Sequence, residues 1–254
     1  MHWKNGRVLA AISLVAAVGC DGPQSALQPA GRDAERIASL FWVMTIGGLM
    51  VWIAVVLVAV YALRSRRGSH SQATANLLVI GGGVALPAVV LGALLAYGMP
   101  VLFAVIAPAP EGALIIEVTG KQWWWRVRYL HPTAHSPRGG DPGPGDGDAA
   151  IETANEIHLP VGQRVELRLD SADVIHSFWV PSLAGKVDMF PGRITRLALE
   201  PTRTGVFKGT CAEYCGASHA HMGLTVVVTP LDEFRSWLEQ QSAARGSGDG
   251  GRDL

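Results

Sequence analysis

The sequence has 254 residues, with 21 basic and 21 acidic side chains and therefore no formal net charge at pH 7. This balance argues against a nucleic-acid partner, because a protein that binds phosphates needs a basic face. Only 17% of the residues are charged while 49% are hydrophobic, which favours a membrane component. The 3 cysteines are too few for a disulfide framework, and two of them lie close together, so they indicate chemistry at a site.

The first residues have the pattern of an export signal. MHWKNGR carries two positive charges, the apolar run VLAAISLVAAV follows, and small residues lead into Cys20. The segment AVGC resembles the lipobox of bacterial lipoproteins, which implies a signal peptide over residues 1–19 and a lipid on Cys20. An uncleaved anchor or an ordinary signal peptide is the alternative. We predict that residues 20–38 form a periplasmic N-terminal segment.

Two apolar runs predict a transmembrane hairpin over residues 39–107. Residues 40–63 carry no charge, and about 20 apolar residues suffice to cross a bilayer as a helix. The second helix is expected over residues 77–106, where glycines and Pro87 are tolerated inside a membrane. The loop between the helices contains RSRR, and positive charge stays on the cytoplasmic side. The chain after the hairpin is therefore expected in the periplasm. A buried hairpin in a soluble core is the alternative, but such cores rarely contain apolar runs of this length.

The chain from residue 111 onward has the texture of a β domain. The segments ALIIEV, WRVRY, IETANEIHL, RVELRL, TRLALE and LTVVV are short alternating runs separated by turn-forming residues. They predict an antiparallel sandwich or barrel over residues 111–230. Glycine, proline and aspartate dominate residues 131–150, which predicts a surface loop. The pattern LDEFRSWLEQQ predicts a closing helix, so residues 231–254 are expected to be a C-terminal helix and a flexible tail.

One short segment, CAEYCGASHAHM, collects the side chains that bind soft metals. Cys211 and Cys215 could instead form a disulfide in an oxidising compartment. However, His219 and Met222 follow closely, and the backbone carbonyl of Glu213 can turn inward between the cysteines. Zinc accepts cysteine and histidine but not an added thioether and carbonyl. Thiolate, imidazole and a weak axial thioether together are typical of copper.

The pattern C-x-E-x-C-x-x-x-H-x-x-M, with an upstream D-x-x-H, resembles the CuA site of cytochrome c oxidase subunit II. The resemblance includes KQWWW, DVIHSFWVP and AGKVDMFPGR, and it extends from the lipobox through the hairpin to the end of the β domain. It implies an N-terminal two-helix transmembrane hairpin plus an all-β, cupredoxin-like Greek-key barrel or sandwich.

The resemblance also implies a set of metal ligands. The residues concerned are His176, Cys211, Glu213, Cys215, His219 and Met222. The two thiolates would bridge two copper ions, each histidine would bind one ion, and the methionine sulfur and the glutamate carbonyl would be weak axial ligands. The side chain of Glu213 would also reach a magnesium ion at the border with subunit I, although a solvated loop carboxylate is the alternative.

Two further positions, Trp123 and Asp173, receive roles from the same resemblance. Trp123 corresponds to the tryptophan through which electrons enter from a c-type cytochrome, while Trp124 and Trp125 are interpreted as core or interface aromatics. Asp173 matches an acidic docking position for that cytochrome. His221 lies between two of the ligands and is expected to point away from the metal.

The implied function is that of subunit II of a respiratory cytochrome c oxidase, a proton-translocating enzyme of the bacterial inner membrane. The chain would accept electrons from the cytochrome and pass them to haem in subunit I, where oxygen is reduced. Its partners would be subunit I, subunit III, the cytochrome donor and membrane lipid, with no nucleic acid. The alternative is a CuA-containing subunit of a nitric oxide reductase. A copper-free quinol oxidase subunit and a copper-delivery protein fit the ligands and the tryptophans less well.

Two departures from the family pattern change what we expect of proton uptake and of the electron donor. The second membrane helix of the family often begins with a glutamate that feeds a proton channel, but no acidic residue occurs between Glu35 and Glu111. Ile80 falls near that position, so we expect proton uptake by another route. Arg126 and Arg128 follow the tryptophans, where the family commonly has acidic residues. Because charge complementarity governs the choice of partner, we expect a less basic electron donor.

Overall fold

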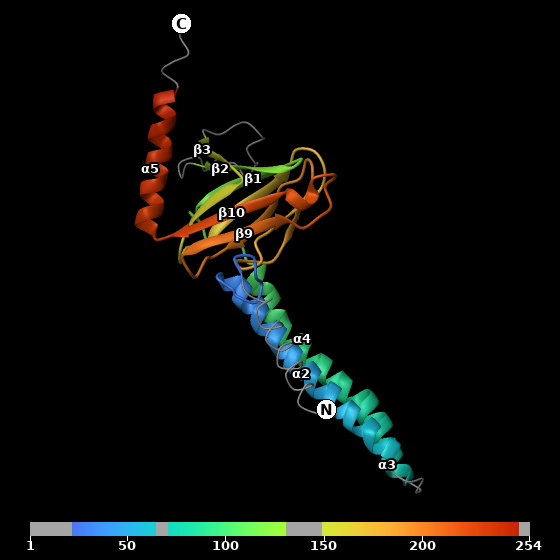
Figure 1. The fold of residues 1–254 in the computed structure, drawn as a ribbon. Coiled ribbons are helices and arrows are strands. Elements are labelled where there is room, and N and C mark those ends of the chain that lie inside the picture. Colours follow the sequence, from blue (N-terminus) through green and yellow to red (C-terminus); the bar gives the residue numbers. More distant parts are fainter. Residues whose placement is uncertain (1–21, 65–70, 131–148, 249–254) are drawn as a thin grey trace, which may run out of the picture. The chain divides into compact units, whose positions relative to one another are not determined.

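The computed structural model describes residues 22–64, 71–130 and 149–248 (Figure 1). The predicted signal peptide, Cys20, residues 65–70 of the loop predicted to be cytoplasmic, and residues 131–148 lie outside the described residues. The chain divides into two compact units. One unit is Arg36–Ile106, and the other combines Met1–Glu35 with Ala107–Leu254.

The first apolar helix is α2 (Arg32–Arg64). Its first turn contains Asp33 and Glu35, whose negative charges are favourable at the positive end of the helix dipole. Because of this polar first turn, the helix begins before the charge-free run that starts at residue 40. The segments Arg32–Arg64 and Gln72–Val105 are both long and apolar enough to cross a membrane, and their most apolar windows are not buried. The predicted pair of apolar helices is therefore confirmed.

The second apolar helix has three parts, namely α3 (Gln72–Asn76), η1 (Leu77–Ala85) and α4 (Leu86–Val105). η1 is a π-helix, and the Leu86 N–H that follows it bonds to the Gly81 carbonyl five residues earlier. Pro87 cannot donate a backbone hydrogen bond, and it lies in the first turn of α4, where proline is well tolerated. α4 begins at Leu86, directly after the π segment. The irregularity expected around the glycines and Pro87 thus takes the form of a π segment.

The other unit is a sandwich of two five-stranded sheets. In spatial order, the first sheet consists of β3 (Ala149–Ala154), β2 (Trp124–Leu130), β1 (Ile115–Lys121), β5 (Val165–Ser171) and β8 (Thr195–Leu199). The second consists of β4 (Glu156–Pro160), β10 (Gly223–Thr229), β9 (Gly205–Cys211), β6 (His176–Trp179) and β7 (Val187–Met189). This arrangement confirms the predicted fold class. The expectation of antiparallel sheets is wrong for two pairs, since β1 with β5 and β10 with β4 are parallel.

The segment IETANEIHL was expected to be one strand, but the structure divides it between the two sheets. β3 ends at Ala154 and β4 begins at Glu156, with Asn155 between them at a φ of 57°. Asparagine adopts this left-handed conformation more readily than most residues. The Asn155 Oδ1 also accepts a 2.8 Å hydrogen bond from the Trp125 N–H, which fixes the crossing point.

The hydrophobic core fills the space between the sheets. Alternate residues of β5 point inward, and Val165, Leu167 and Leu169 are completely buried. Burial of each such side chain contributes roughly 2 kcal/mol. The closing helix α5 (Leu231–Gly248) lies beside β3 and β4, and its Trp237 ring packs edge-on against Tyr129 at 5.2 Å between ring centroids. Sheets and closing helix together form the rigid body on which the site is built.

The segment before α2 is attached to the β domain by several polar contacts. The Ala30 N–H donates to the Ser182 carbonyl, and the Ala30 carbonyl accepts from the Thr202 N–H. Asp33, whose side chain is only 1% exposed, forms a 3.4 Å ion pair with Arg164. The same guanidinium donates to the Ala107 carbonyl at 2.9 Å. Arg164 therefore ties together two distant stretches of backbone.

Replacing Arg164 by alanine is expected to destabilise this unit by about 3 kcal/mol, because a buried carboxylate loses its ion pair. For a domain of this size, the midpoint of thermal unfolding should fall by on the order of 10 °C. Arg196→Ala is the matched control, since Arg196 is 57% exposed and 4.0 Å from Glu166, and surface pairs contribute about 1 kcal/mol or less. Near-UV circular dichroism of the full chain in detergent measures both midpoints. Equal midpoints for the two variants would contradict this account.

Candidate metal centre

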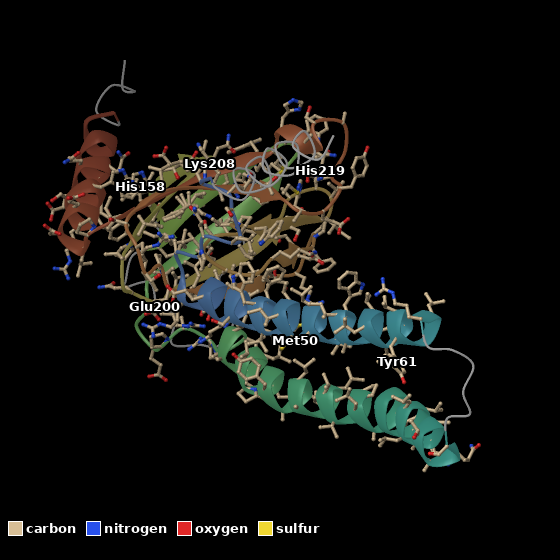
Figure 2. All side chains as sticks on the ribbon, turned by 60° about the horizontal axis from the view of Figure 1, so that its bottom comes forward. Met50, Tyr61, His158, Glu200, Lys208 and His219 are labelled. Carbon is tan, nitrogen blue, oxygen red and sulfur yellow. The ribbon has the colours of Figure 1, made fainter. Side chains whose placement is uncertain are left out.

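The site lies where two distant segments meet at the ends of neighbouring strands. β9 ends at Cys211 and β6 begins at His176, and the two strands pair so that Phe178 lies opposite Cys211. The loop after β9 continues through a 3₁₀ turn, η2 (His219–His221), before β10 begins. Figure 2 shows His219 far from His158, with the β domain between them. The site is therefore confined to one end of the sandwich.

Six potential ligand atoms converge in this loop. Four separations link these atoms: 3.8 Å between Cys211 Sγ and His176 Nδ1, 3.2 Å between Cys211 Sγ and the Glu213 carbonyl, 3.5 Å between Cys215 Sγ and His219 Nδ1, and 3.7 Å between Cys215 Sγ and Met222 Sδ. The ligand atoms of His176, Cys211 and Cys215 all lie within 4.8 Å of one another. All six sequence-predicted ligand residues are thus brought together. Such a group can hold a metal ion.

The ligand side chains are shielded from solvent. Met222 and His176 are completely buried, and Cys211 and Cys215 are 4% and 3% exposed. Both cysteines are free, so the structure does not contain the alternative disulfide between them. Burial, together with a smaller effect of the neighbouring Cys211, raises the pKa of the Cys215 thiol to about 12. A metal that binds the thiolate must therefore displace a proton from this thiol.

Two glycines leave space for the site. A Cβ atom on Gly120 would lie 2.8 Å from Cδ2 of the His176 ring, which is closer than real contacts allow. Gly216 has a φ of 120°, and a Cβ there would lie 3.2 Å from the Trp123 indole. Both positions therefore require glycine. Neither glycine was predicted to belong to the site. Gly120 carried a usable signal, because a glycine inside a strand-like run often marks the close approach of another group to the backbone.

The Trp123 indole connects the surface to the ligand loop. Its ring is 37% exposed, and its Nε1–H donates to the Cys215 carbonyl at 3.2 Å. The Gln122 side-chain amide donates to the same oxygen at 2.8 Å. Trp125 is completely buried in the core, whereas Trp124 is half-buried beneath the Lys121 ammonium. Of the three tryptophans, Trp123 is therefore the one bonded to the ligand loop.

Asp173 faces the site. Its Oδ1 lies 2.8 Å from His176 Nε2, and its Oδ2 accepts a 2.8 Å hydrogen bond from the Gln122 N–H. Partial burial alone would raise the pKa of Asp173, but hydrogen bonds from Gln122, His176 and Val174 outweigh this effect and lower the pKa. The carboxylate is therefore charged at neutral pH. Sequence reasoning did not predict this contact with His176.

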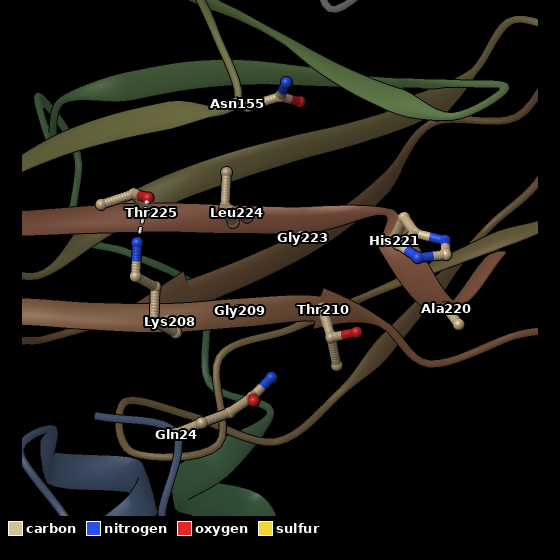
Figure 3. Close-up of a pocket in the computed structure, with 10 residues that line it drawn as sticks. All are labelled: Gln24, Asn155, Lys208, Gly209, Thr210, Ala220, His221, Gly223, Leu224 and Thr225. Carbon is tan, nitrogen blue, oxygen red and sulfur yellow. Dashed lines mark hydrogen bonds between the residues drawn. The ribbon is translucent and has the colours of Figure 1, made fainter. Parts of the chain in front are cut away.

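Two polar residues of the ligand loop point elsewhere. The Glu213 carboxylate is exposed and accepts from the Tyr214 N–H at 3.1 Å. His221 is exposed and lines a polar hollow of about 360 Å³, together with Lys208 and Thr225 (Figure 3). Within the described part of the chain, His176, Cys211 and Cys215 are the one group of three or more histidine, cysteine or acidic residues whose ligand atoms lie close enough together to hold a metal ion. The magnesium role of Glu213 therefore stays a prediction that needs ligands from another chain.

Comparison with known proteins identifies the family. A family model described as cytochrome c oxidase subunit II, periplasmic domain, matches residues 114–229. The alternative cytochrome c oxidase subunit 2 of Bradyrhizobium diazoefficiens is 32% identical over 239 residues, which cover 85% of this chain and 82% of that protein. The cytochrome c oxidase subunit 2 of Cereibacter sphaeroides is 29% identical over 274 residues, which cover 92% and 90% of the two chains.

A solved structure gives a further comparison. The crystal structure of the periplasmic domain of subunit II of cytochrome oxidase from Bradyrhizobium japonicum aligns with a TM-score of 0.44 and 30% identity. The alignment covers 54% of this chain and 99% of that domain. On the sequence matches, the chain belongs to the cytochrome c oxidase subunit II family. The resemblance stated from the sequence is therefore confirmed.

In the reduced, metal-free protein, Cys215 is expected to react slowly with iodoacetamide. A thiol with a pKa of about 12 is only ~10⁻⁴ thiolate at pH 8, against about a quarter for an ordinary thiol. The folded protein should therefore be alkylated at Cys215 on the order of 10³-fold more slowly than the same chain in urea, and the rate should rise from pH 8 to pH 11. Mass spectrometry of the peptide that contains Cys215 measures both rates. Similar rates in the two states would show that the thiol is not held protonated.

Proposed function

We propose that this chain is the electron-transfer subunit of a respiratory cytochrome c oxidase. It accepts electrons from a c-type cytochrome at a dinuclear CuA centre and delivers them to haem in subunit I, where oxygen is reduced and protons are translocated. The observation that carries the proposal is the convergence of two free thiols, two imidazoles, a thioether and a carbonyl at one shielded point. Membership of the subunit II family supports it.

The donor set fits copper. Thiolate and thioether sulfur favour soft metals, and imidazole nitrogen also suits copper. A structural zinc ion would be four-coordinate and would not need the thioether and the carbonyl as ligands. Copper bound here would supply a one-electron redox couple shared between two ions. The cysteines would bridge the ions, while His176 and His219 would each bind one of them.

The protein holds these ligands in place and excludes water. The pairing of β6 with β9 sets His176 beside Cys211, and the tight loop through η2 returns His219 and Met222 to Cys215. Ligands held by rigid strands stay close to their working geometry. Because four of the six ligand residues are buried, little solvent has to reorient when the charge of the site changes. These properties suit fast electron transfer.

The surface around the site suits a docked electron donor. Four exposed apolar side chains belong to segments that contact the ligands, namely Trp123, Val174, Ile175 and Tyr214. Exposed apolar side chains that gather near a functional site are typical of interaction surfaces. Among these four, the Trp123 indole donates a hydrogen bond to the Cys215 carbonyl of the ligand loop. We therefore assign electron uptake to Trp123.

The nearby charges bear on the identity of the donor. Arg128 pairs with Glu117 at 3.4 Å, and Arg126 lies 3.5 Å from the Thr119 hydroxyl. The positive charges of these two arginines favour a donor that is less basic than the usual partners of the family. Arg128 contributes less than Arg126, because its charge is partly neutralised by Glu117. Asp173 was assigned to docking on the resemblance alone.

The remaining partners follow from the resemblance and from the two apolar helices. The hairpin would anchor the chain in a bacterial inner membrane beside subunits I and III, with the β domain in the periplasm. A lipid on Cys20 would add a second anchor. The exposed carboxylate of Glu213 would complete a magnesium site together with residues of subunit I.

The first test is the copper content of the full chain in detergent, measured by native mass spectrometry. The wild-type chain should bind two copper ions. His219→Ala should bind fewer, because His219 lies 3.5 Å from Cys215 Sγ. His221→Ala is the matched control, since His221 is exposed and should leave the copper content at two. One or no copper in the wild-type chain, or equal losses in both variants, would contradict the proposal.

A second test concerns electron uptake in the assembled oxidase. Trp123→Phe removes the indole N–H that bonds to the Cys215 carbonyl. We expect the rate of electron transfer from the reduced cytochrome to fall about tenfold, which corresponds to roughly 1.4 kcal/mol, with the copper content unchanged. Trp124→Phe is the control, because Trp124 contacts Lys121 instead of the ligand loop. Stopped-flow spectroscopy measures the rates. Equal rates in the two variants would show that Trp123 is not the group through which electrons enter.

A further inference from the structure

Asp173 makes an unusual number of contacts for a residue expected only to meet a partner protein. Its side chain is 31% exposed and lies in the turn between β5 and β6. One carboxylate oxygen lies 2.8 Å from His176 Nε2, and the other accepts from the Gln122 N–H at 2.8 Å. Both oxygens are thus directed toward the metal centre and its neighbouring turn.

The contact with His176 determines which ring nitrogen is available to a metal. A carboxylate accepts hydrogen bonds only, so the Nε2 atom must carry the proton that it donates to Asp173. Nδ1 is then free to act as a ligand, and it faces Cys211 Sγ at 3.8 Å. The ring cannot turn over easily, because it is completely buried and packs against Gly120. Ligand histidines commonly have such a partner, which fixes the tautomer and the ring orientation.

The second carboxylate oxygen holds the turn that contains Trp123. The Gln122 N–H donates to Asp173, and the Gln122 side chain donates to the Cys215 carbonyl at 2.8 Å. The next residue, Trp123, donates to the same carbonyl. A single carboxylate therefore connects one metal ligand with the group assigned to electron uptake.

The turn around Asp173 is itself preorganised. The Val174 N–H donates to Asp173 Oδ1 at 2.7 Å, and the Ser171 hydroxyl donates to the Val174 carbonyl. The Asp173 N–H lies 3.4 Å from the same hydroxyl oxygen. These bonds fix the direction of the carboxylate without help from a partner protein.

We propose that Asp173 is a positioning residue of the metal centre, which orients His176 and the Gln122–Trp123 turn. Its effect on the metal centre passes through these groups and requires no contact with the electron donor. The proposal rests on the function proposed above, since it requires that His176 binds copper. This role is distinct from the docking role that the family resemblance implied for the same position.

The test compares variants of the full chain in detergent, with no electron donor present. Asp173→Asn should weaken copper binding about 10- to 100-fold in competition with a chelator, as expected for the loss of a partner of a ligand histidine. It should also change the histidine nitrogen couplings in electron–nuclear double resonance. Asp173→Glu keeps the charge but displaces the carboxylate, so it should lose affinity as well. Glu152→Gln removes a charge from the exposed side of β3 and should behave as the wild-type chain.

The alternative docking role predicts different results. A docking residue would leave copper affinity and nitrogen couplings unchanged in Asp173→Asn, while KM for the cytochrome would rise in the assembled oxidase. Asp173→Glu would then retain the wild-type KM. That combination would overturn the proposal.

A measurement on the wild-type chain covers the case in which the variants do not fold. In copper-loaded protein labelled with ¹⁵N-histidine, the Nε2 proton of buried His176 should exchange slowly with D₂O, while that of half-buried His219 exchanges quickly. Fast exchange of both protons would overturn the positioning role. If the wild-type chain did not bind two coppers at all, the proposed function would fail instead, so the two failures are distinguishable.

Discussion

The pairing of β6 with β9 is the constraint on which the site depends. It sets Phe178 opposite Cys211 and thereby brings His176, 35 positions earlier in the chain, to the cysteine sulfur. The remaining ligands follow within one loop, so only this one long-range contact is needed to complete the set. The register of this pairing is essential, because a shift by one residue would move the His176 side chain to the opposite face of the sheet.

Several residues around this contact depart from the types that would best stabilise the local structure. β1 carries Gly120 where a larger residue would stabilise the strand, because the His176 ring occupies the space. Two thiols and an imidazole occupy buried positions where hydrophobic side chains would stabilise the fold more. The resulting loss of stability is limited by local hydrogen bonds, among them those that Asp173 makes to His176 and to Gln122. Departures of this kind are expected at functional sites.

Much of the fold could be predicted because its signals are local. Charge-free runs of membrane-spanning length predict the two apolar helices, and alternating runs predict the β domain. The grouping of the candidate ligands was also predictable, since five of the six lie within twelve residues. The division of IETANEIHL at Asn155 was missed, because an alternating pattern does not reveal that the two halves join different sheets. The π segment before Pro87 was likewise not evident from composition.

The contacts that orient the ligands could not be predicted from the sequence. Asp173 and Gln122 are 51 positions apart, and Trp123 and Cys215 are 92 positions apart. No pattern within either segment indicates that they meet. The family resemblance assigned Asp173 to a surface role, while its observed contacts face inward. Residues of this kind become visible only when the sandwich has brought its loops together.

The electron paramagnetic resonance spectrum of the copper-loaded full chain tests the central claim most directly. The account predicts one unpaired electron shared equally by two copper nuclei, because the family resemblance implies a dinuclear centre and the ligand atoms of His176, Cys211 and Cys215 lie within 4.8 Å of one another. The hyperfine pattern would then show coupling to both nuclei. A spectrum from a single copper nucleus would contradict the account and would indicate a mononuclear site in the same loop.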